Sequence, residues 1–504
     1  MFIGTPAETF SGSCKSAESD KVVALVGSAE RADEGRAKGG PEVYPRYDDI
    51  VAGVPAYEGY LSVDELEAST DRFIAAHPDV EAWRAGASRS GHDIRCLEVG
   101  SGPLRAVLVG APHPEEPIGT LVLEYLLPLL AETDLAERLG FRFSVVKVSD
   151  PDGMRLNERW FREPGDLAGF LLRQYRPPFV EQFEWTFPFD YKRYAFAQPL
   201  PEARAVMEVV GRAPLDLYMG LHNSHCGGAY FYVSHDDATL NGELAAVLAA
   251  AGLPPNRGEP EMPYLNAFGD AVFEAFDLAD DYEYFARYGV EPAAALQGGT
   301  SSDSYAQAVW DCFTLVAEVA YFTSPKAADA SPAGVTRAEA VLRGIEMERA
   351  YVDWLHERYV EAAGHLTGES PWQRALYAYL MGSKDDLRAE TEMVARESHF
   401  AEEATVAQLF SSAYLREVDV LSRAGHLASM AAAEAQQNEA LLAVRAAAEE
   451  KILTRAPRLA AGGAIEPVPV RTLVQAQLAA LLCTLDAVRE RFRPAHPRPP
   501  APLV

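Results

Sequence analysis

The first two thirds of the chain alternate between short apolar runs and longer stretches with helical spacing. An apolar helix is expected at 118–130, and residues 94–99 alternate between apolar and polar, as a half-buried strand does. Strands that alternate with helices predict an α/β fold, with a mixed, mostly parallel, twisted sheet and helices on both of its faces. Continuous apolar runs typical of buried strands lie at 106–110 (AVLVG), 144–148 (SVVKV), 215–220 (LDLYMG) and 313–322 (FTLVAEVAYF).

Turn-rich stretches and changes in composition set the expected domain boundaries. Ser62 and Glu65 form a capping-box pattern where the first helix of the folded domain should begin. The stretch 323–334 (TSPKAADASPAG) is interpreted as a linker, and beyond it Ala, Glu, Leu and Arg dominate with helical spacing. The predicted division is a flexible segment at 1–55, an α/β domain at 56–325, an all-α C-terminal region at 335–492 and a Pro-rich tail at 493–504.

Composition narrows the range of partners. The 504 residues include 45 basic and 74 acidic side chains, a net charge of −29 that repels phosphate backbones and anionic lipid. Nucleic acid and membrane surfaces are therefore not expected as partners. Five scattered cysteines without CxxC spacing argue against a disulfide framework. With no signal-peptide pattern and no apolar run of about 18 residues, a cytoplasmic location is expected.

Polar residues that follow the predicted strands form the candidate site. In open α/β sheets, sites form at the carboxyl ends of the strands. The first apolar run is followed by APHPEEP, the second by DPDGMRLNERWFRE and the third by LHNSHCGG, while the fourth contains an acid with apolar neighbours that keep it dry. The groups collected in this way are His113, Glu116, Arg159, Arg162, His222 and Glu318.

Two imidazoles and one carboxylate suit zinc and leave a coordination position open for water. We therefore predict that His113, Glu116 and His222 bind one zinc ion per chain. His225 competes with His222 within LHNSH, and His222 is preferred because it lies nearer the strand end. A second HxxE spacing, at 399–402, follows no predicted strand and is interpreted as part of a solvated helix face.

The order of these groups resembles that of the zinc carboxypeptidases of the carboxypeptidase A type, over residues 56–325. The zinc motif of that family matches His113 and Glu116, and its distant third ligand matches His222. The resemblance extends to the turn at 150–153 (DPDG), with its Arg-rich continuation, and to the Gly-Gly segment at 298–300. It implies a zinc-dependent hydrolase that removes a residue from the carboxyl end of a peptide or small amino-acyl conjugate.

The resemblance also implies roles for single residues. Glu318 would be the general base, and Arg162 would polarise the scissile carbonyl. Arg193, next to Lys192, stands where the family holds the terminal carboxylate of its substrate. Tyr288 is the nearest substitute for the family's mobile tyrosine. The expected substrate contacts are Arg159, Lys192, Arg193, Tyr288 and Asp303.

Departures from the family pattern bear on the substrate. Glu115 stands inside the HxxE motif, where the family often has arginine, and Lys192 replaces an asparagine. Lys192 favours a substrate with an extra carboxylate, whereas Asp303 favours one with a basic side chain, and both readings stay open. The alternatives to a carboxypeptidase are a zinc amidase or deacylase acting on acylated amino acids, or a catalytically silent binding domain. The C-terminal helices are expected to cover the α/β domain or to mediate self-association.

Overall fold

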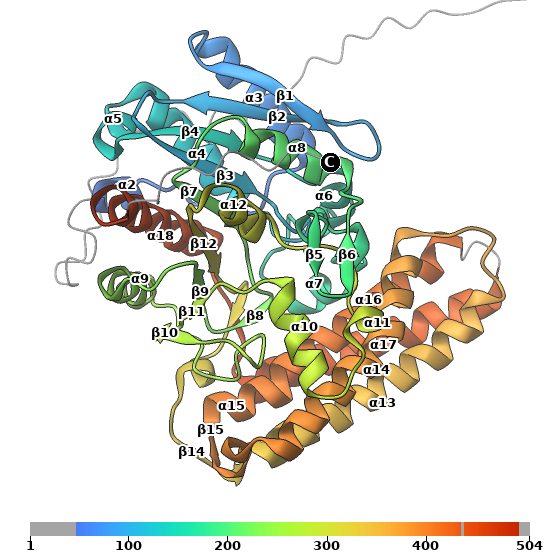
Figure 1. Ribbon diagram of the computed structural model, residues 1–504. Helices are drawn as coiled ribbons and strands as arrows, with labels where there is room; N and C mark the ends of the chain where they lie inside the picture. The colour runs from blue at the N-terminus through green and yellow to red at the C-terminus, as the bar shows by residue number, and fades with distance from the viewer. Residues whose placement is uncertain (1–46, 435–437, 493–504) are drawn as a thin grey trace, which may run out of the picture. The chain divides into compact units, whose positions relative to one another are not determined.

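A nine-stranded mixed sheet forms the centre of the α/β region in the computed structural model (Figure 1). Its strands are, in chain order, β1 (Glu81–Ala87), β2 (Asp93–Val99), β3 (Leu104–Gly110), β4 (Phe141–Val146), β7 (Leu217–Leu221), β9 (Tyr230–Val233), β10 (Ala267–Gly269), β11 (Val272–Glu274) and β12 (Phe313–Glu318). Their order across the sheet is β1-β2-β4-β3-β7-β12-β9-β11-β10. The four at the centre, β4, β3, β7 and β12, run parallel, with antiparallel pairs on both sides. The predicted mixed sheet is confirmed, and the four continuous apolar runs supply its centre.

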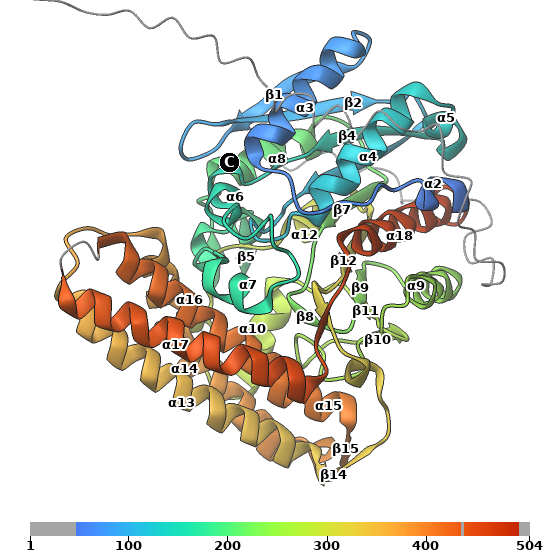
Figure 2. The ribbon, with the colours of Figure 1, turned by 180° about the vertical axis from the view of Figure 1, so that it is seen from behind.

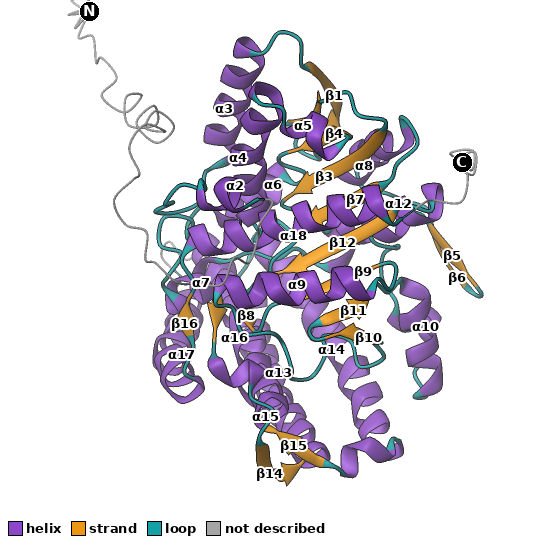
Figure 3. Ribbon diagram, turned by 90° about the vertical axis from the view of Figure 1, so that its left-hand side faces the viewer, coloured by secondary structure: helices purple, strands orange, loops and turns teal. Residues whose placement is uncertain are grey.

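Helices cover both faces of this sheet, which is why its central strands are apolar at nearly every position. On one face α4, α9 and α18 (Val470–Glu490) pack together, and on the other α8 and α12 pack (Figure 3). The helices up to residue 310 are α2 (Asp48–Ala52), α3 (Val63–Ala76), α4 (Ile118–Glu132), α5 (Leu135–Leu139), α6 (Pro151–Asn157), α7 (Leu167–Arg173), α8 (Pro201–Gly211), α9 (Ala238–Ala251), α10 (Leu278–Arg287), α11 (Pro292–Ala295) and α12 (Ser302–Trp310).

The C-terminal region is helical, as expected, and four long helices run side by side in it (Figure 2). Thr336 and Glu339 form the capping box that begins the first of them. Helix α16 also packs against α7 of the α/β region. None of the described helices is long and apolar enough to cross a membrane. The helices of this region are α13 (Arg337–Ala363), α14 (Pro371–Arg396), α15 (Val406–Phe410), α16 (Arg416–Glu434) and α17 (Glu439–Gly463).

The last helix, α18, departs from the predicted division. Composition assigned it to the helical region, but it lies against α4, α9 and β12 of the α/β region. Most of its residues are buried, so it needs neighbours on several sides, and the sheet face provides them. The Gln477 side chain donates hydrogen bonds to the backbone carbonyls of His222 and Ala317. Helix α18 therefore contacts both the strand end that carries His222 and the strand that carries Glu318.

Short elements complete the described chain, which covers residues 47–434 and 438–492, all within one compact unit. The expected Pro-rich tail at 493–504 and most of the expected flexible segment at 1–55 lie outside the described residues. The last part of that segment is described, and there α2 forms and packs on α18. The expected linker at 323–334 is ordered and contains η3 and the first residues of β14. The short elements are β5 (Phe189–Tyr191), β6 (Tyr194–Phe196), β8 (Cys226–Gly227), β13 (Phe322–Thr323), β14 (Pro332–Thr336), β15 (Glu403–Thr405), β16 (Glu466–Pro467), η1 (Phe179–Glu181), η2 (Phe183–Trp185), η3 (Pro325–Ala328), η4 (Ser398–Ala401) and η5 (Ser411–Leu415).

Candidate metal centre and its cavity

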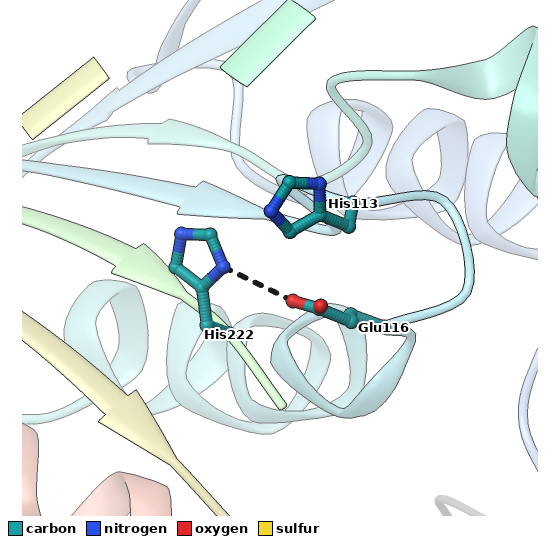
Figure 4. A group of neighbouring side chains, drawn as sticks. All are labelled: His113, Glu116 and His222. Carbon is teal, nitrogen blue, oxygen red and sulfur yellow. Dashed lines mark hydrogen bonds and ion pairs between the residues drawn. The ribbon is translucent and has the colours of Figure 1, made fainter. Parts of the chain in front are cut away.

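Two strand ends at the centre of the sheet place His113, Glu116 and His222 side by side (Figure 4). His113 and Glu116 lie in the loop between β3 and α4, and His222 follows β7 directly. Because β3 and β7 are parallel neighbours, their carboxyl ends meet at one edge of the sheet. All three side chains are buried, and one candidate ligand atom from each lies within 4.8 Å of the others.

The donor atoms of this group fit a metal ion. Nδ1 of His113 is buried without a hydrogen-bond partner among the described residues, and burial together with Arg176 lowers the pKa of this imidazole well below its usual value. Its neutral form is the one that binds metal. Nδ1 of His222 lies 3.1 Å from Oε2 of Glu116, which also accepts a hydrogen bond from the Asn223 amide. Two imidazoles and a carboxylate leave room for water at zinc.

His225, the alternative to His222, lies outside this group. Its Nε2 is 3.7 Å from Glu115 and its Nδ1 is 3.8 Å from Asp419, on helix α16. Glu115 itself is fully buried and accepts a hydrogen bond of 2.7 Å from Arg176. The acid inside the HxxE motif thus belongs to a buried network that ties the metal-side loop to the C-terminal helices.

A cavity of about 1100 Å³ opens from the metal group and extends to the walls formed by α10, α14 and α16. Three buried carboxylates besides Glu116 line its inner part: Glu184, Asp303 and Glu318. Burial raises the pKa of Glu184 to about 7 and raises that of Asp303. Burial, and then repulsion from Glu116, raises the pKa of Glu318 well above its usual value. Of the three, Glu184 has a pKa near neutral pH, where a carboxyl group can exchange protons readily.

Glu184 was missed in the sequence, although it lies next to the metal group. Its Oε1 accepts hydrogen bonds from the Ser302 amide at 3.1 Å and the Ser302 hydroxyl at 2.8 Å. The same oxygen lies 3.8 Å from Nε2 of His222, the ring nitrogen opposite the one that faces Glu116. It stands in the short helical turn η2, with no strand before it to mark it as a site residue.

Arg176 is the arginine that the structure brings to the metal group. Its guanidinium lies 3.3 Å from Oε1 of Glu116 and 3.2 Å from Nε2 of His113, and it lines the cavity. It comes from the stretch between α7 and η1, where no predicted strand precedes it. The only signal in the sequence was the short RPPF stretch that follows helix α7, which carries no recognised spacing.

The two arginines predicted beside the site lie elsewhere, which corrects their expected roles. Arg162 is 62% exposed and forms an ion pair with Glu65 at 2.5 Å, because the chain beyond α6 turns toward the first turn of α3. Arg159 is exposed as well; it donates to the Arg173 carbonyl at 3.0 Å and lies over the Trp372 ring. Neither is among the residues that line the cavity.

The predicted carboxylate grip is likewise outside the cavity. Lys192 and Arg193 form the exposed turn between β5 and β6, where Lys192 adopts a left-handed backbone (φ 52°). They form ion pairs with Glu283 and Glu291, respectively. Their role was implied by the family resemblance, and a resemblance in sequence cannot show that a two-stranded hairpin carries them away from the sheet.

Of the remaining predicted contacts, one lies in the cavity and one does not. Asp303 lines the cavity from the first turn of α12. Tyr288 is buried at the end of α10, where its hydroxyl donates a hydrogen bond of 2.8 Å to Glu397, and it does not line the cavity. A tyrosine held in this way is not placed to move toward a substrate.

Comparison with known proteins gives structural matches only. No protein-family model matches the chain, and no curated protein matches it in sequence. A metallo-carboxypeptidase from Burkholderia cenocepacia aligns with 15% identity and a TM-score of 0.31, over 52% of this chain and 60% of that protein. Carboxypeptidase A from Helicoverpa armigera aligns with 12% identity and a TM-score of 0.35, over 69% of this chain and 80% of that protein. Both belong to the class that the sequence motifs resemble. With identity and TM-scores this low, function is inferred below from the side chains alone.

Proposed function

We propose that the protein is a zinc-dependent hydrolase of amide bonds, with one zinc ion per chain bound by His113, Glu116 and His222. One observation carries the proposal. The two imidazoles and the carboxylate share a cavity with Glu318, a fourth buried group that can accept a proton. Metal ligands with a separate general base are the set that hydrolysis of an amide by activated water requires.

Each side chain of the cavity has a role in this reaction. The bound ion would lower the pKa of a water molecule and polarise the scissile carbonyl. Glu318 would accept the proton of that water and pass it to the leaving nitrogen. Arg176 would stabilise the negative charge that develops on the carbonyl oxygen, the role that the sequence assigned to Arg162.

Two substrate classes fit this chemistry. The first is a peptide or amino-acyl conjugate with a free carboxylate, cleaved at its C-terminal amide bond. The second is a non-peptide amide, which would make the protein an amidase or deacylase. The second is favoured by the position of Lys192 and Arg193, which lie on an exposed hairpin outside the cavity and so offer no grip for a terminal carboxylate inside it.

Metal analysis tests the proposal directly. Purified protein should contain about one zinc per chain by mass spectrometry, and the Glu116→Ala variant should lose it. Glu402→Ala is the matched control, because Glu402 completes the second HxxE spacing of the chain but lies outside the metal group. Protein that takes up no zinc even after reconstitution would exclude this function.

Substrate profiling separates the two classes. Release of single amino acids from the carboxyl end of unmodified peptides would establish a carboxypeptidase. Turnover confined to acylated amino acids, with no release from peptides, would establish an amidase or deacylase. Each profile should disappear in Glu318→Gln, so that a contaminating peptidase is recognised by its persistence in that variant.

A further inference from the structure

We infer that the part of the cavity between helices α10 and α14 binds an ammonium group that the substrate carries at a distance from its scissile amide, against Asp281 and Asp386. The assignment of this group to the substrate rests on the proposed function, because it places the ammonium on the molecule whose amide bond is cleaved. Helix α14 belongs to the C-terminal region, beyond the residues 56–325 over which the chain resembles the zinc carboxypeptidases. The site is therefore formed in part by a helix that the resemblance does not cover.

Helices α10 and α14 lie side by side and present carboxyl groups to the cavity (Figure 1). They pack together because Phe285 of α10 and Leu387 of α14 belong to one apolar cluster. Asp281 and Asp386, one from each helix, both line the cavity. Asp281 accepts a hydrogen bond of 2.7 Å from the Tyr264 hydroxyl, whereas Asp386 has no hydrogen bond or ion pair among the described residues.

The charges that act on these two carboxyl groups are also negative. Burial, and then repulsion from Asp386, raises the pKa of Asp281 to about 7, against the opposing effect of its hydrogen bond from Tyr264. The cavity wall excludes water from Asp386, and this effect, followed by repulsion from Glu348, raises the pKa of Asp386 to about 6. Above neutral pH both groups are therefore ionised, and the free-energy cost of holding two such charges near each other favours a bound cation.

The basic side chains that line the cavity beyond the metal group have other partners. Among the described residues, none of them lies within ion-pair distance of Asp281 or Asp386. Lys384 of α14 is exposed and does not line the cavity. The partnerships are those of Arg416 with Glu348 and Glu390, of Arg423 with the Tyr379 ring at 5.0 Å, of His225 with Glu115 and Asp419, and of Arg388 on α14 with Asp385. The protein thus leaves the counter-ion of Asp281 and Asp386 to a ligand.

An ammonium group suits these carboxylates better than a metal ion does. Among the described residues, the His and Glu atoms that converge within 4.8 Å are those of the metal group, and neither Asp281 nor Asp386 belongs to such a set. An ammonium nitrogen contacts carboxylate oxygens at about 2.8 Å, so it can bridge oxygens that lie farther apart than the ligands of a metal ion.

A buried hydroxyl beside Asp386 is a second and independent observation. Ser383 lies one turn before Asp386 on α14, is 4% exposed and lines the cavity. Its hydroxyl oxygen has no hydrogen-bond partner among the described residues, although a serine within a helix commonly donates to the carbonyl four residues earlier. Buried polar atoms without partners are rare in folded proteins. An ammonium bound at Asp386 supplies N–H groups that this oxygen can accept.

The Tyr284 ring completes the site on the opposite helix. It lies one turn after Asp281 on α10 and lines the cavity. Burial, and then the negative charge of Glu390, raises the pKa of the Tyr284 hydroxyl, and Asp386 and Asp281 act in the same direction, so all three carboxylates lie near this side chain. Aromatic faces attract ammonium groups, and an anionic group would be repelled by the three carboxylates.

A pair of small probes of nearly equal size tests the inference. Butylammonium and butanol differ mainly in charge, and their binding to zinc-loaded protein can be compared by titration calorimetry at about pH 8, where both aspartates are ionised. Butylammonium should bind at least tenfold more tightly than butanol. Asp386→Asn should weaken butylammonium binding at least fivefold, and Asp353→Asn, at an exposed aspartate of α13 that does not line the cavity, should change it less than twofold. Equal binding of the two probes, or equal effects of the two variants, would overturn the inference.

A second variant and a second readout keep the outcome clear. If Asp386→Asn does not fold, as judged by circular dichroism, Asp281→Asn takes its place and should also weaken butylammonium binding at least fivefold. Equal kcat/KM for two amides that differ only in a distal ammonium or hydroxyl group would remove the inference and leave the proposed function standing. Butylammonium binding that depends on Asp386, in protein that takes up no zinc, would support the ammonium site and remove the proposed function.

Discussion

Replacement of Glu318 by glutamine tests the proposed mechanism most directly. Glu318 ends strand β12 and is 8% exposed, between the buried residues Ala317 and Val319. Glutamine has nearly the same shape, so packing should be preserved, but it cannot accept a proton from a water molecule. Glu318 is also absent from the metal-binding group, so the variant should bind zinc as the wild-type protein does.

The size of the effect follows from the role assigned to this carboxylate. A positioned general base contributes about 10²–10⁴-fold to a rate. Each factor of ten corresponds to about 1.4 kcal/mol, so the activation free energy should rise by about 3–5 kcal/mol. Because burial and Glu116 raise the pKa of Glu318, its ionised form is destabilised in the folded state. Glutamine removes that cost, and thermal stability at neutral pH should be at least that of the wild-type protein.

The assay compares kcat for zinc-loaded wild-type and Glu318→Gln proteins, with metal content and melting temperature measured on the same samples. Glu274→Gln is the control. Glu274 is the last residue of β11, in the same sheet as Glu318, and it does not line the cavity. A variant that binds a full equivalent of zinc and keeps more than about a tenth of wild-type kcat would refute the assignment of Glu318 as base.

Three further substitutions have expected outcomes. Arg176→Met should lower kcat/KM at least tenfold, whereas Arg162→Met should change it less than twofold. The reason is that, of these two arginines, Arg176 contacts the metal group and Arg162 does not. Equal effects of the two variants on kcat/KM in steady-state assays would contradict the structure. Burial raises the pKa of Asp150 from 3.8 to about 7, so the folded state binds this proton more tightly than the unfolded state. Wild type therefore loses stability relative to Asp150→Asn as pH rises from about 4 to about 7. In urea unfolding, the variant's advantage should reach at most about 4 kcal/mol above pH 7 and vanish near pH 4. Leu482→Ala, at a fully buried position in α18, should lower the free energy of unfolding by about 2–5 kcal/mol, and a loss below 1 kcal/mol would show that α18 is not packed as described.

The sequence predicted the parts of the site that local rules position. His113, Glu116 and His222 each follow an apolar run, and the carboxyl ends of parallel strands meet at one edge of a sheet. Glu318 was identified in the same way, as an acid within an apolar strand. At these positions a short stretch of sequence determines both the element and the place where it ends.

The residues that were misplaced lie in irregular segments, where the sequence gives no direction. Arg162 and Arg193 were assigned through the family resemblance, but a turn toward α3 and a projecting hairpin carry them to the surface. Arg176 and Glu184 reach the cavity from the loops between α7 and β5, which have no periodicity to interpret. The position of α18 was missed because composition shows that a helix is apolar and does not show which surface covers it.

The contact of Gln477 with the carbonyls of His222 and Ala317 also bears on how the protein is made. Gln477 follows His222 by 255 residues in the sequence. A ribosome adds about 5–20 residues per second. The histidine therefore leaves the ribosome roughly 13–50 seconds before the glutamine that supports it. Any nascent chain or fragment that ends before α18 lacks this support and exposes the apolar sheet face that α18 covers. On the proposed function, competence for hydrolysis should thus arise only after α18 has been synthesised, and chains that end before it should be inactive.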